Sequence, residues 1–330
     1  MNVKAAVIGT IFMDCKGFAH QAYVPTGRNL GHVQFVHGGV GRNVAENLGL
    51  LGVSTSLVST VDTSGLGQEV IARLQRSGVD TSTLQHTSEN GMGMWLAILE
   101  QDGGLAGSIS HMPDLKHFNT LLAERGEEII PSASHLILEL DLNADLARRT
   151  LALAASHGKP VYGIPGNCDV ILTHPELLKE LSCFICNDIE AGRLLGHALE
   201  AASPAAVLDE LKRFVDEQEL QSMVVTLGAK GSVFYDRSTG DSGFQPVFPV
   251  KPVDSSGAGD AFFSGTVLGL LYGFPLRSSV VLGTRVASWT IESPENNCFE
   301  LARKVREEPL FHDVLKLQAA YGKEQEIPAL

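Results

Sequence analysis

Short runs of hydrophobic residues alternate along the chain with segments whose hydrophobic positions recur every three or four residues. The short runs are rich in β-branched residues and predict buried strands at 4–10, 55–61, 134–140, 159–164, 181–187 and 221–228. The intervening segments have helical spacing and mostly stop at glycine, at 41–52, 67–78, 143–158 and 203–218. This alternation predicts an α/β fold with a mainly parallel central sheet and helices on both faces.

Two segments, 15–37 and 83–111, interrupt this alternation and show no helical pattern. The second alternates on either side of the sequence QDGG, as a β-hairpin would. We interpret the two segments as a small antiparallel β lid formed by two excursions from one domain. No linker divides the chain, so residues 1–330 are predicted to be a single domain, and 299–330 to be one helical stretch followed by a polar tail.

Composition narrows the classes of function. Hydrophobic residues make up 44% of the chain, which is enough for a sizeable core, and the net charge is −13 without any run of Lys or Arg. A nucleic-acid partner would require a basic face, so a small-molecule substrate is expected instead. No apolar run is long enough to span a bilayer and the N-terminus does not resemble a signal peptide, so we expect a cytoplasmic protein with no membrane partner.

The five cysteines indicate a reducing compartment, since their odd number and scattered spacing give no disulfide framework. Cys183 and Cys186 form a C-x-x-C sequence within a predicted buried strand. Because neighbouring positions of a strand face opposite ways, and no second pair of ligands follows, we interpret these two cysteines as packing residues rather than a zinc or redox site.

The sequence DSSGAGDAFFSG, at 254–265, is the strongest candidate for chemistry. A glycine-rich turn that enters a helix leaves backbone N–H groups unpaired at the positive end of the helix dipole, which suits a phosphate. Asp260 at this helix start could accept a proton from a hydroxyl held beside the same phosphate. The plainer alternative is an ordinary N-terminal capping aspartate after a glycine turn.

Four motifs together resemble the ribokinase-like (PfkB) carbohydrate and nucleoside kinases. DSSGAGDAFFSG is similar to the C-terminal signature of that family, and GGVGRNVAENLGLLG, at 38–52, to its N-terminal signature. NDIEAGRLLG, at 187–196, resembles its N-x-x-E motif, and VVTLGAKGSVFYD, at 224–236, resembles its nucleotide-site strand and turn. The resemblance implies a ribokinase-like fold and phosphorylation of a sugar or nucleoside hydroxyl with ATP and Mg²⁺.

The resemblance also implies roles in phosphoryl transfer at the matching positions. Asp260 would be the catalytic base, with an anion hole from Gly257, Ala258 and Gly259. Asn187 and Glu190 would order magnesium through water, and a monovalent cation such as potassium would lie beside Asp254. The residues implied to contact the nucleotide are Thr226, Gly228, Gly231, Asn187 and Asn297. On the plainer reading, Asn187 is a surface N-cap, Glu190 is a solvated side chain and LGAKG is a plain hairpin turn.

The acceptor site is implied in the same way. The residues expected to contact the substrate are Asp14, Gly39 and Asn43 at its hydroxyls, and His20 and His111 in the lid at a base. The plainer alternatives are a turn residue for Asp14 and surface or lid-packing residues for the two histidines. Dimerisation through the lid strands is also expected, because an open lid sheet leaves exposed strand edges.

Segments 14–20, 38–52, 108–115 and 293–301 resemble the pseudouridine kinase branch of the family, which implies transfer to the 5′-hydroxyl of pseudouridine. Another nucleoside, or a free sugar such as ribose or fructose, is the alternative acceptor, and a non-catalytic sugar or nucleoside sensor is the alternative function. A Walker-type site is excluded because Lys230 precedes Gly231. A dinucleotide site at Gly39 is disfavoured because Val44 replaces the third glycine.

Overall fold

The computed structural model of the chain, which describes residues 3–100, 104–140 and 142–321, contains two β-sheets. The strands of the larger sheet are β1 (Lys4–Ile8), β4 (Ser54–Asp62), β5 (Val79–Asp80), β6 (Leu84–Thr87), β9 (His135–Glu139), β10 (Val161–Ile164), β11 (Cys183–Asn187), β12 (Ser222–Thr226), β13 (Ser232–Asp236) and β14 (Asp241–Gln245). They lie in the order β14-β13-β12-β11-β10-β9-β1-β4-β5, with β6 paired to β4. Strands β5 to β12 along this order are parallel, and only β13 and β14 are antiparallel additions. All six predicted strands are confirmed.

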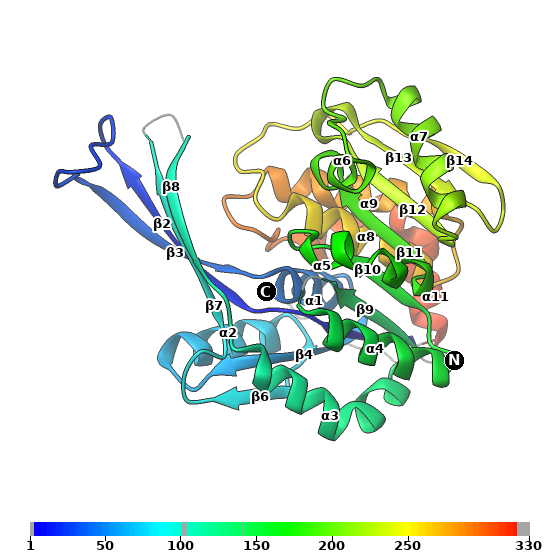
Figure 1. Ribbon diagram of the computed structural model, residues 1–330, viewed down its shortest axis with the longest axis horizontal. Helices are drawn as coiled ribbons and strands as arrows, with labels where there is room; N and C mark the ends of the chain where they lie inside the picture. The colour runs from blue at the N-terminus through cyan, green and yellow to red at the C-terminus, as the bar shows by residue number, and fades with distance from the viewer. Residues whose placement is uncertain (1–2, 101–103, 141, 322–330) are drawn as a thin grey trace.

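Helices cover both faces of this sheet (Figure 1). One face carries α1 (Val40–Leu50), α2 (Gly65–Arg76), α8 (Ala258–Leu271), α9 (Leu276–Ile291), α10 (Leu301–Glu307) and α11 (His312–Tyr321). The other carries α3 (Leu115–Ser132), α4 (Ala144–Ser156), α5 (Asp169–Thr173), α6 (Asp188–Leu195) and α7 (Pro204–Glu217). Successive residues of β1 point into different cores, Val7 into the first and Ile8 into the second, which explains why the strands are hydrophobic at every position.

The second sheet, which we call the lid sheet, has the order β3-β2-β7-β8 and extends away from the helix-covered body (Figure 1). Its strands are β2 (Phe12–Ala19), β3 (Gly31–Gly38), β7 (Gly93–Leu99) and β8 (Leu105–His111). The β2–β3 and β7–β8 pairs are antiparallel, but the central β2–β7 pair is parallel. The lid sheet is therefore mixed rather than antiparallel as predicted, because β2 and β7 both leave the larger sheet in the same direction.

Smaller differences concern the edges of the predicted segments. Part of 83–111 belongs to the larger sheet, since β6 pairs with β4 in register from Ser59 to Asp62. The predicted hairpin of β7 and β8 is confirmed, but 101–103 of its turn lie outside the described residues. The C-terminal stretch is not one helix, because a 3₁₀ turn beginning at Pro309 separates α10 from α11, and the predicted polar tail at 322–330 lies outside the description. No helix within the described ranges is long and apolar enough to cross a membrane.

Candidate active site

The start of α8 is the glycine-rich turn that the sequence singled out. Gly257 has φ +74, and a Cβ there would lie 2.1 Å from the carbonyl oxygen of Asn296, so only glycine fits. The amide of Ala258 donates to the carbonyl of Ser255 at 3.2 Å and is therefore occupied, in contrast to its predicted role in the anion hole. Among the described residues, the amides of Gly257, Gly259 and Asp260 have no hydrogen-bond acceptor. These three amides and the helix dipole form a surface suited to a phosphate.

Asp260 lies in the first turn of α8, partly buried beside the start of α1. Burial raises the pKa of Asp260 to about 7, because a charged carboxylate is less well solvated there. A hydrogen bond from Asn43 and the charge of Arg42 oppose this rise in pKa, whereas the charges of Glu139 and Glu190 add to it. A carboxyl group with a pKa near neutrality is well matched to accepting a proton in general base catalysis.

Asn43, which was predicted to contact the hydroxyls of the acceptor, also contacts Asp260 directly. Its Nδ2 donates to Oδ2 of Asp260 at 2.7 Å. The other end of the same amide, Oδ1, accepts a hydrogen bond from the guanidinium of Arg42. Arg42 is fully buried and also donates to the carbonyl of His37 and pairs with Glu46. Arg42, which the sequence reasoning missed, thus fixes which end of the Asn43 amide faces Asp260.

Asp14 lies near the start of β2, where the lid sheet leaves the larger sheet. It is contacted by Asn296, whose carbonyl oxygen lies next to Gly257 at the start of α8. A Cβ on Gly38 would lie 2.6 Å from Oδ1 of Asp14, so the glycine makes room for the carboxylate. Asn296 donates to Oδ2 of Asp14 at 3.4 Å, and burial raises the pKa of Asp14. Gly39, with φ +95, turns the chain from β3 into α1. The structure therefore brings Asp14, Gly39 and Asn43 together beside α8.

The two lid histidines do not join this group. His20 is exposed just after β2, six residues beyond Asp14, which corresponds to about 20 Å along a strand. His111 pairs with Met94 in the strand register, whereas Asp14 pairs with Trp95. Since successive strand residues face opposite ways, His111 lies on the other face of the lid sheet from Asp14, where it contacts Asn90. The structure does not support the predicted contact of either histidine with the acceptor.

Three residues that the sequence reasoning did not name lie at this site. Trp95 is the register partner of Asp14 on the neighbouring strand, so the two side chains share one face of the lid sheet. We call the face that carries Asp14 and Trp95 the inner face. Glu139, at the end of β9, accepts hydrogen bonds from the amides of Thr10 at 2.7 Å and Gly41 at 3.2 Å. Lys16 follows Asp14 on the same inner face, because it is two residues further along β2. A polar residue at the end of a buried strand was the only sequence signal for Glu139.

The predicted magnesium residues form the N-terminal cap of α6. Oδ1 of Asn187 accepts from the amide of Glu190, and Oε2 of Glu190 accepts from the amide of Asn187, both at 2.8 Å. No group of three or more metal-ligating side chains exists within the described residues. The donor set still suits Mg²⁺, which keeps several waters and needs only one or two carboxylates. Glu190 also raises the pKa of Asp260 by its negative charge, an effect that a bound divalent cation would offset.

Three of the predicted nucleotide residues lie at the end of β12 or in the turn that follows it, namely Thr226, Gly228 and Gly231. Gly228 has φ +54 and Gly231 has φ +106, and a Cβ on Gly231 would lie 2.3 Å from the carbonyl oxygen of Gln245. Thr226 Oγ1 donates to the carbonyl of Cys186 at 3.4 Å. Asn297 is fully buried and donates to the carbonyl of Asn43 at 3.0 Å, so it supports α1. Its neighbour Asn296, and not Asn297, reaches the Asp14 carboxylate.

Asp254, the predicted cation ligand, begins the turn that leads into α8. Its Oδ1 accepts from the amide of Ser256 at 2.8 Å, and its Oδ2 lies 3.6 Å from the ammonium of Lys16. Burial tends to raise the pKa of Asp254, but the hydrogen bonds from Ser256 and the charge of Lys16 together lower it. A protein cation therefore already lies on one side of this carboxylate.

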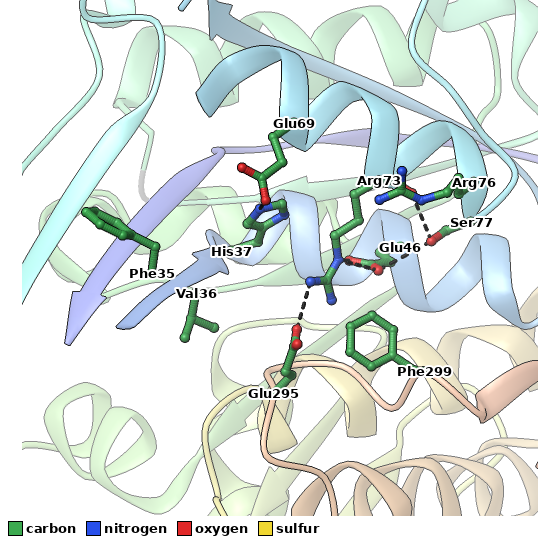
Figure 2. A pocket seen from close by; sticks show the side chains of 10 residues that line it. All are labelled: Phe35, Val36, His37, Glu46, Glu69, Arg73, Arg76, Ser77, Glu295 and Phe299. Carbon is green, nitrogen blue, oxygen red and sulfur yellow. Dashed lines mark hydrogen bonds and ion pairs between the residues drawn. The ribbon is translucent and has the colours of Figure 1, made fainter. Parts of the chain in front are cut away.

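A pocket of about 190 Å³ lies between β3, α1, α2 and the loop before α10 (Figure 2). Arg73 lies at its centre, and its guanidinium bonds to Glu46 at 2.8 Å and to Glu295 at 2.7 Å. The ring of Phe299 lies 4.6 Å from the same guanidinium. Glu46 also pairs with Arg42, the residue that orients Asn43. These ion pairs therefore connect α2 and the loop at Glu295 to the buried side chains beneath the active site.

Comparisons with known proteins identify the family of the chain. Residues 2–299 match the model of the pfkB family carbohydrate kinases. The guanosine-inosine kinase of Exiguobacterium acetylicum is 33% identical over 89% of this chain and 96% of its own length. The pseudouridine kinase of Escherichia coli (strain K12) is 26% identical over 88% of this chain and 91% of its own length.

The fold matches solved structures over nearly the whole chain. The Arabidopsis thaliana ribokinase complexed with ribose and ATP has a TM-score of 0.76 at 20% identity, covering 96% of this chain and 99% of its own. The Cryptococcus neoformans ribokinase in complex with ADP has a TM-score of 0.76 at 19% identity, covering 93% of this chain and 99% of its own. The predicted ribokinase-like α/β fold is thereby confirmed, and the chain belongs to the pfkB family of carbohydrate kinases, which phosphorylate alcohol groups with ATP.

Proposed function

We propose that this protein transfers the terminal phosphoryl group of ATP to the 5′-hydroxyl of a nucleoside, with guanosine and inosine as the first candidates for the acceptor. The observation that carries the proposal is the group formed by Asp260, Asn43 and the open amides at the start of α8. The choice of acceptor rests on the similarity to guanosine-inosine kinase along 96% of that relative. This replaces pseudouridine, expected from sequence, as the leading acceptor.

In the proposed mechanism, the acceptor hydroxyl lies between Asp14 and Asp260. Asn43 holds Oδ2 of Asp260, so Oδ1 accepts the hydroxyl proton as the oxygen attacks phosphorus. The amides of Gly257, Gly259 and Asp260 stabilise negative charge on the transferring group. Magnesium, held through water at Glu190, would neutralise charge on the phosphates when bound.

The inner face of the lid sheet supports a nucleoside rather than a free sugar. Trp95 is the register partner of Asp14 on the neighbouring strand and is only partly buried, and we expect its ring to cover a flat base attached to a sugar held at Asp14. Aromatic side chains stack on bases with a gain of about 1–3 kcal/mol per base. A free sugar would not use this ring in the same way.

Pseudouridine remains the second candidate acceptor because of the 26% identity to pseudouridine kinase over most of both chains. Both candidate classes carry a ring carbonyl next to a ring N–H, so a single donor and acceptor pair could bind either.

We further propose that the protein forms a homodimer through the outer face of the lid sheet, the face opposite Asp14. Large hydrophobic side chains are exposed there, with exposed fractions of 67% for Val33, 57% for Phe35 and 69% for Ile109. An apolar sheet face of this kind favours association. Sedimentation equilibrium tests the proposal, and a monomer at micromolar concentration would contradict it.

The substrate assignment is tested by incubating the protein with ATP, Mg²⁺ and a panel of acceptors, and measuring the mass of the products. The panel contains inosine, guanosine, pseudouridine, uridine, adenosine, ribose and fructose. We expect the highest kcat/KM for inosine or guanosine. A higher kcat/KM for pseudouridine would reverse the order of the two candidates, and phosphorylation of ribose or fructose alone would refute a nucleoside kinase. The Asp260→Asn variant serves as the control for contaminating kinases.

A further inference from the structure

Lys16 is a buried side chain whose hydrogen-bonding capacity is only partly used within the described part of the chain. It lies in β2 and only 6% of its surface is exposed. Its ammonium has three N–H donors. One donates to Oγ of Ser256 at 3.3 Å, and the nearest carboxylate oxygen, Oδ2 of Asp254, lies 3.6 Å away. Burying a charge with so few partners is unfavourable unless a ligand completes them.

The surroundings of this ammonium point to an anionic ligand. Ser256 immediately precedes Gly257, where the open amides of the α8 turn begin. Asp254 balances the charge of Lys16 as an ion pair, but at 3.6 Å its Oδ2 lies beyond hydrogen-bond distance from the ammonium, so the pair leaves room for a further acceptor. The Lys16 ammonium and the open amides thus lie at the same turn. The ammonium is carried by the lid sheet, and the amides belong to the start of α8.

We propose that Lys16 binds the terminal phosphate of ATP and remains bound to the phosphoryl group during its transfer. The ligand class is a polyphosphate terminus or a phosphate monoester. The inference rests on the proposed function only in taking the α8 turn as the place where that phosphate binds.

In the reaction, the bond between the terminal phosphorus and the bridging oxygen of ATP breaks while a bond to the acceptor oxygen forms. The acceptor proton goes to Asp260, and ADP leaves with the bridging oxygen. Lys16 exchanges its hydrogen bond to Ser256 for one to a phosphate oxygen. It acts by charge and position and transfers no proton.

The position of Lys16 on the lid sheet gives the contact a further consequence. Asp14 and Lys16 share one face of one strand, so the strand that holds the acceptor also supplies the cation at the phosphate. Placement of the lid sheet therefore governs both partners of the reaction together.

The test compares nucleotides with and without the terminal phosphate, in the absence of any acceptor. Binding of Mg²⁺-AMP-PNP and Mg²⁺-ADP is measured by calorimetry for the wild type, Lys16→Met and Lys16→Arg. Methionine keeps the length and packing of the side chain but removes its charge. We expect Lys16→Met to weaken AMP-PNP binding about 10- to 100-fold, the range of one charge-assisted hydrogen bond, and ADP binding less than about 3-fold. Lys16→Arg should recover part of the AMP-PNP affinity.

The matched control is Lys251→Met, which removes the same charge from an exposed position three residues before Asp254. It should change neither affinity, so a loss equal to that of Lys16→Met would show a general charge effect and contradict the proposal. Equal weakening of AMP-PNP and ADP in Lys16→Met would show that Lys16 merely tethers the lid to the turn. Unchanged binding of both in a folded Lys16→Met protein would also overturn the proposal.

The variants stay informative if one of them unfolds. Should Lys16→Met lose its thermal transition, Lys16→Arg and Lys16→Gln give the same comparison between the two nucleotides. Failure of the acceptor panel, together with a selective loss of AMP-PNP affinity, would refute the nucleoside kinase proposal and leave the role of Lys16 intact. Phosphorylation of a nucleoside in the acceptor panel, together with unchanged AMP-PNP affinity in Lys16→Met, would refute the role of Lys16 and leave the nucleoside kinase proposal intact.

Discussion

The two sides of the candidate active site are built from opposite kinds of residues. The α8 side uses a glycine-rich turn, which leaves the backbone amides of Gly257, Gly259 and Asp260 without an acceptor among the described residues. The lid side uses the long or polar side chains of Asp14, Lys16 and Trp95, carried on strands. The difference suggests that the α8 turn fixes the phosphoryl group, whereas the lid sheet selects the acceptor and brings charge to it. The predictions below separate these two roles.

The largest effect is expected for Asp260→Asn, which removes the proton acceptor but keeps the shape. Turnover should fall by about two to four decades, the usual contribution of a positioned base, while the affinity for ATP changes little. Single-turnover kinetics and nucleotide calorimetry measure the two quantities. Undiminished turnover would remove Asp260 from the mechanism.

The same variant should be more stable than the wild type at pH 8. Since burial raises the pKa of Asp260 to about 7, the folded state keeps a proton that the unfolded chain releases near pH 4. The group therefore destabilises the fold progressively as pH rises from about 4 through 7. Asparagine carries no charge, so we expect the free energy of unfolding at pH 8 to increase by about 1–3 kcal/mol, and little change at pH 4. Urea titrations at both values check the difference.

Gly257→Ala tests the backbone of the α8 turn. Alanine at φ +74, with its Cβ 2.1 Å from the Asn296 carbonyl, should lower the free energy of unfolding by about 2–4 kcal/mol. The matched variant is Gly259→Ala, where the added Cβ meets nothing within 4 Å. It should keep the stability of the wild type but lower turnover, because the methyl group enters the space beside the open amides. Equal stability of the two variants would mean that the turn is not held as described.

On the lid side, Asp14→Ala should raise the KM of the acceptor about 10- to 100-fold, as expected for lost hydrogen bonds to a charged group, and the KM of ATP by less than about 3-fold. His111→Ala is the comparison within the same sheet. It lies on the opposite face, so it should leave both KM values near those of the wild type. A similar increase for both substrates in Asp14→Ala would contradict a role restricted to the acceptor.

The smallest effect concerns pH. Since Asp260 must be deprotonated to accept a proton, kcat/KM should rise with pH and level off above the pKa of about 7. Asn43→Ala removes a donor that lowers this pKa, so its profile should be shifted to higher pH. A profile that is flat between pH 5 and 9 would indicate that proton transfer to Asp260 does not limit the rate.

The sequence was sufficient for the larger sheet and for the α8 turn because both depend on local signals. Buried parallel strands are hydrophobic at every position, and the turn at Gly257 requires glycine for reasons within a few residues of it. The long helix α3 was missed because Gly126 and Pro131 interrupt its pattern. The pairing of β2 with β7, about 80 residues apart, carries no local signal, so the lid was expected to be antiparallel.

The same limit applies to the residues of the site. Lys16 acquires its significance only from Ser256, 240 residues away, and Glu139 from Thr10, 129 residues away. Arg42 and Asn43 are neighbours in the sequence, but Asn43 contacts Asp260 across 217 residues. His111 was placed at the acceptor because the sequence alone does not reveal which face of the lid sheet it occupies.

The most direct test of the central claim is a crystal structure of the protein with Mg²⁺, ADP, tetrafluoroaluminate and inosine. Tetrafluoroaluminate mimics the phosphoryl group in transfer. We predict that its fluorides accept hydrogen bonds from the amides at the start of α8, with the 5′-oxygen of inosine beside Asp260. A fluoroaluminate beyond hydrogen-bond distance of these amides, or an inosine 5′-oxygen remote from Asp260, would contradict the account.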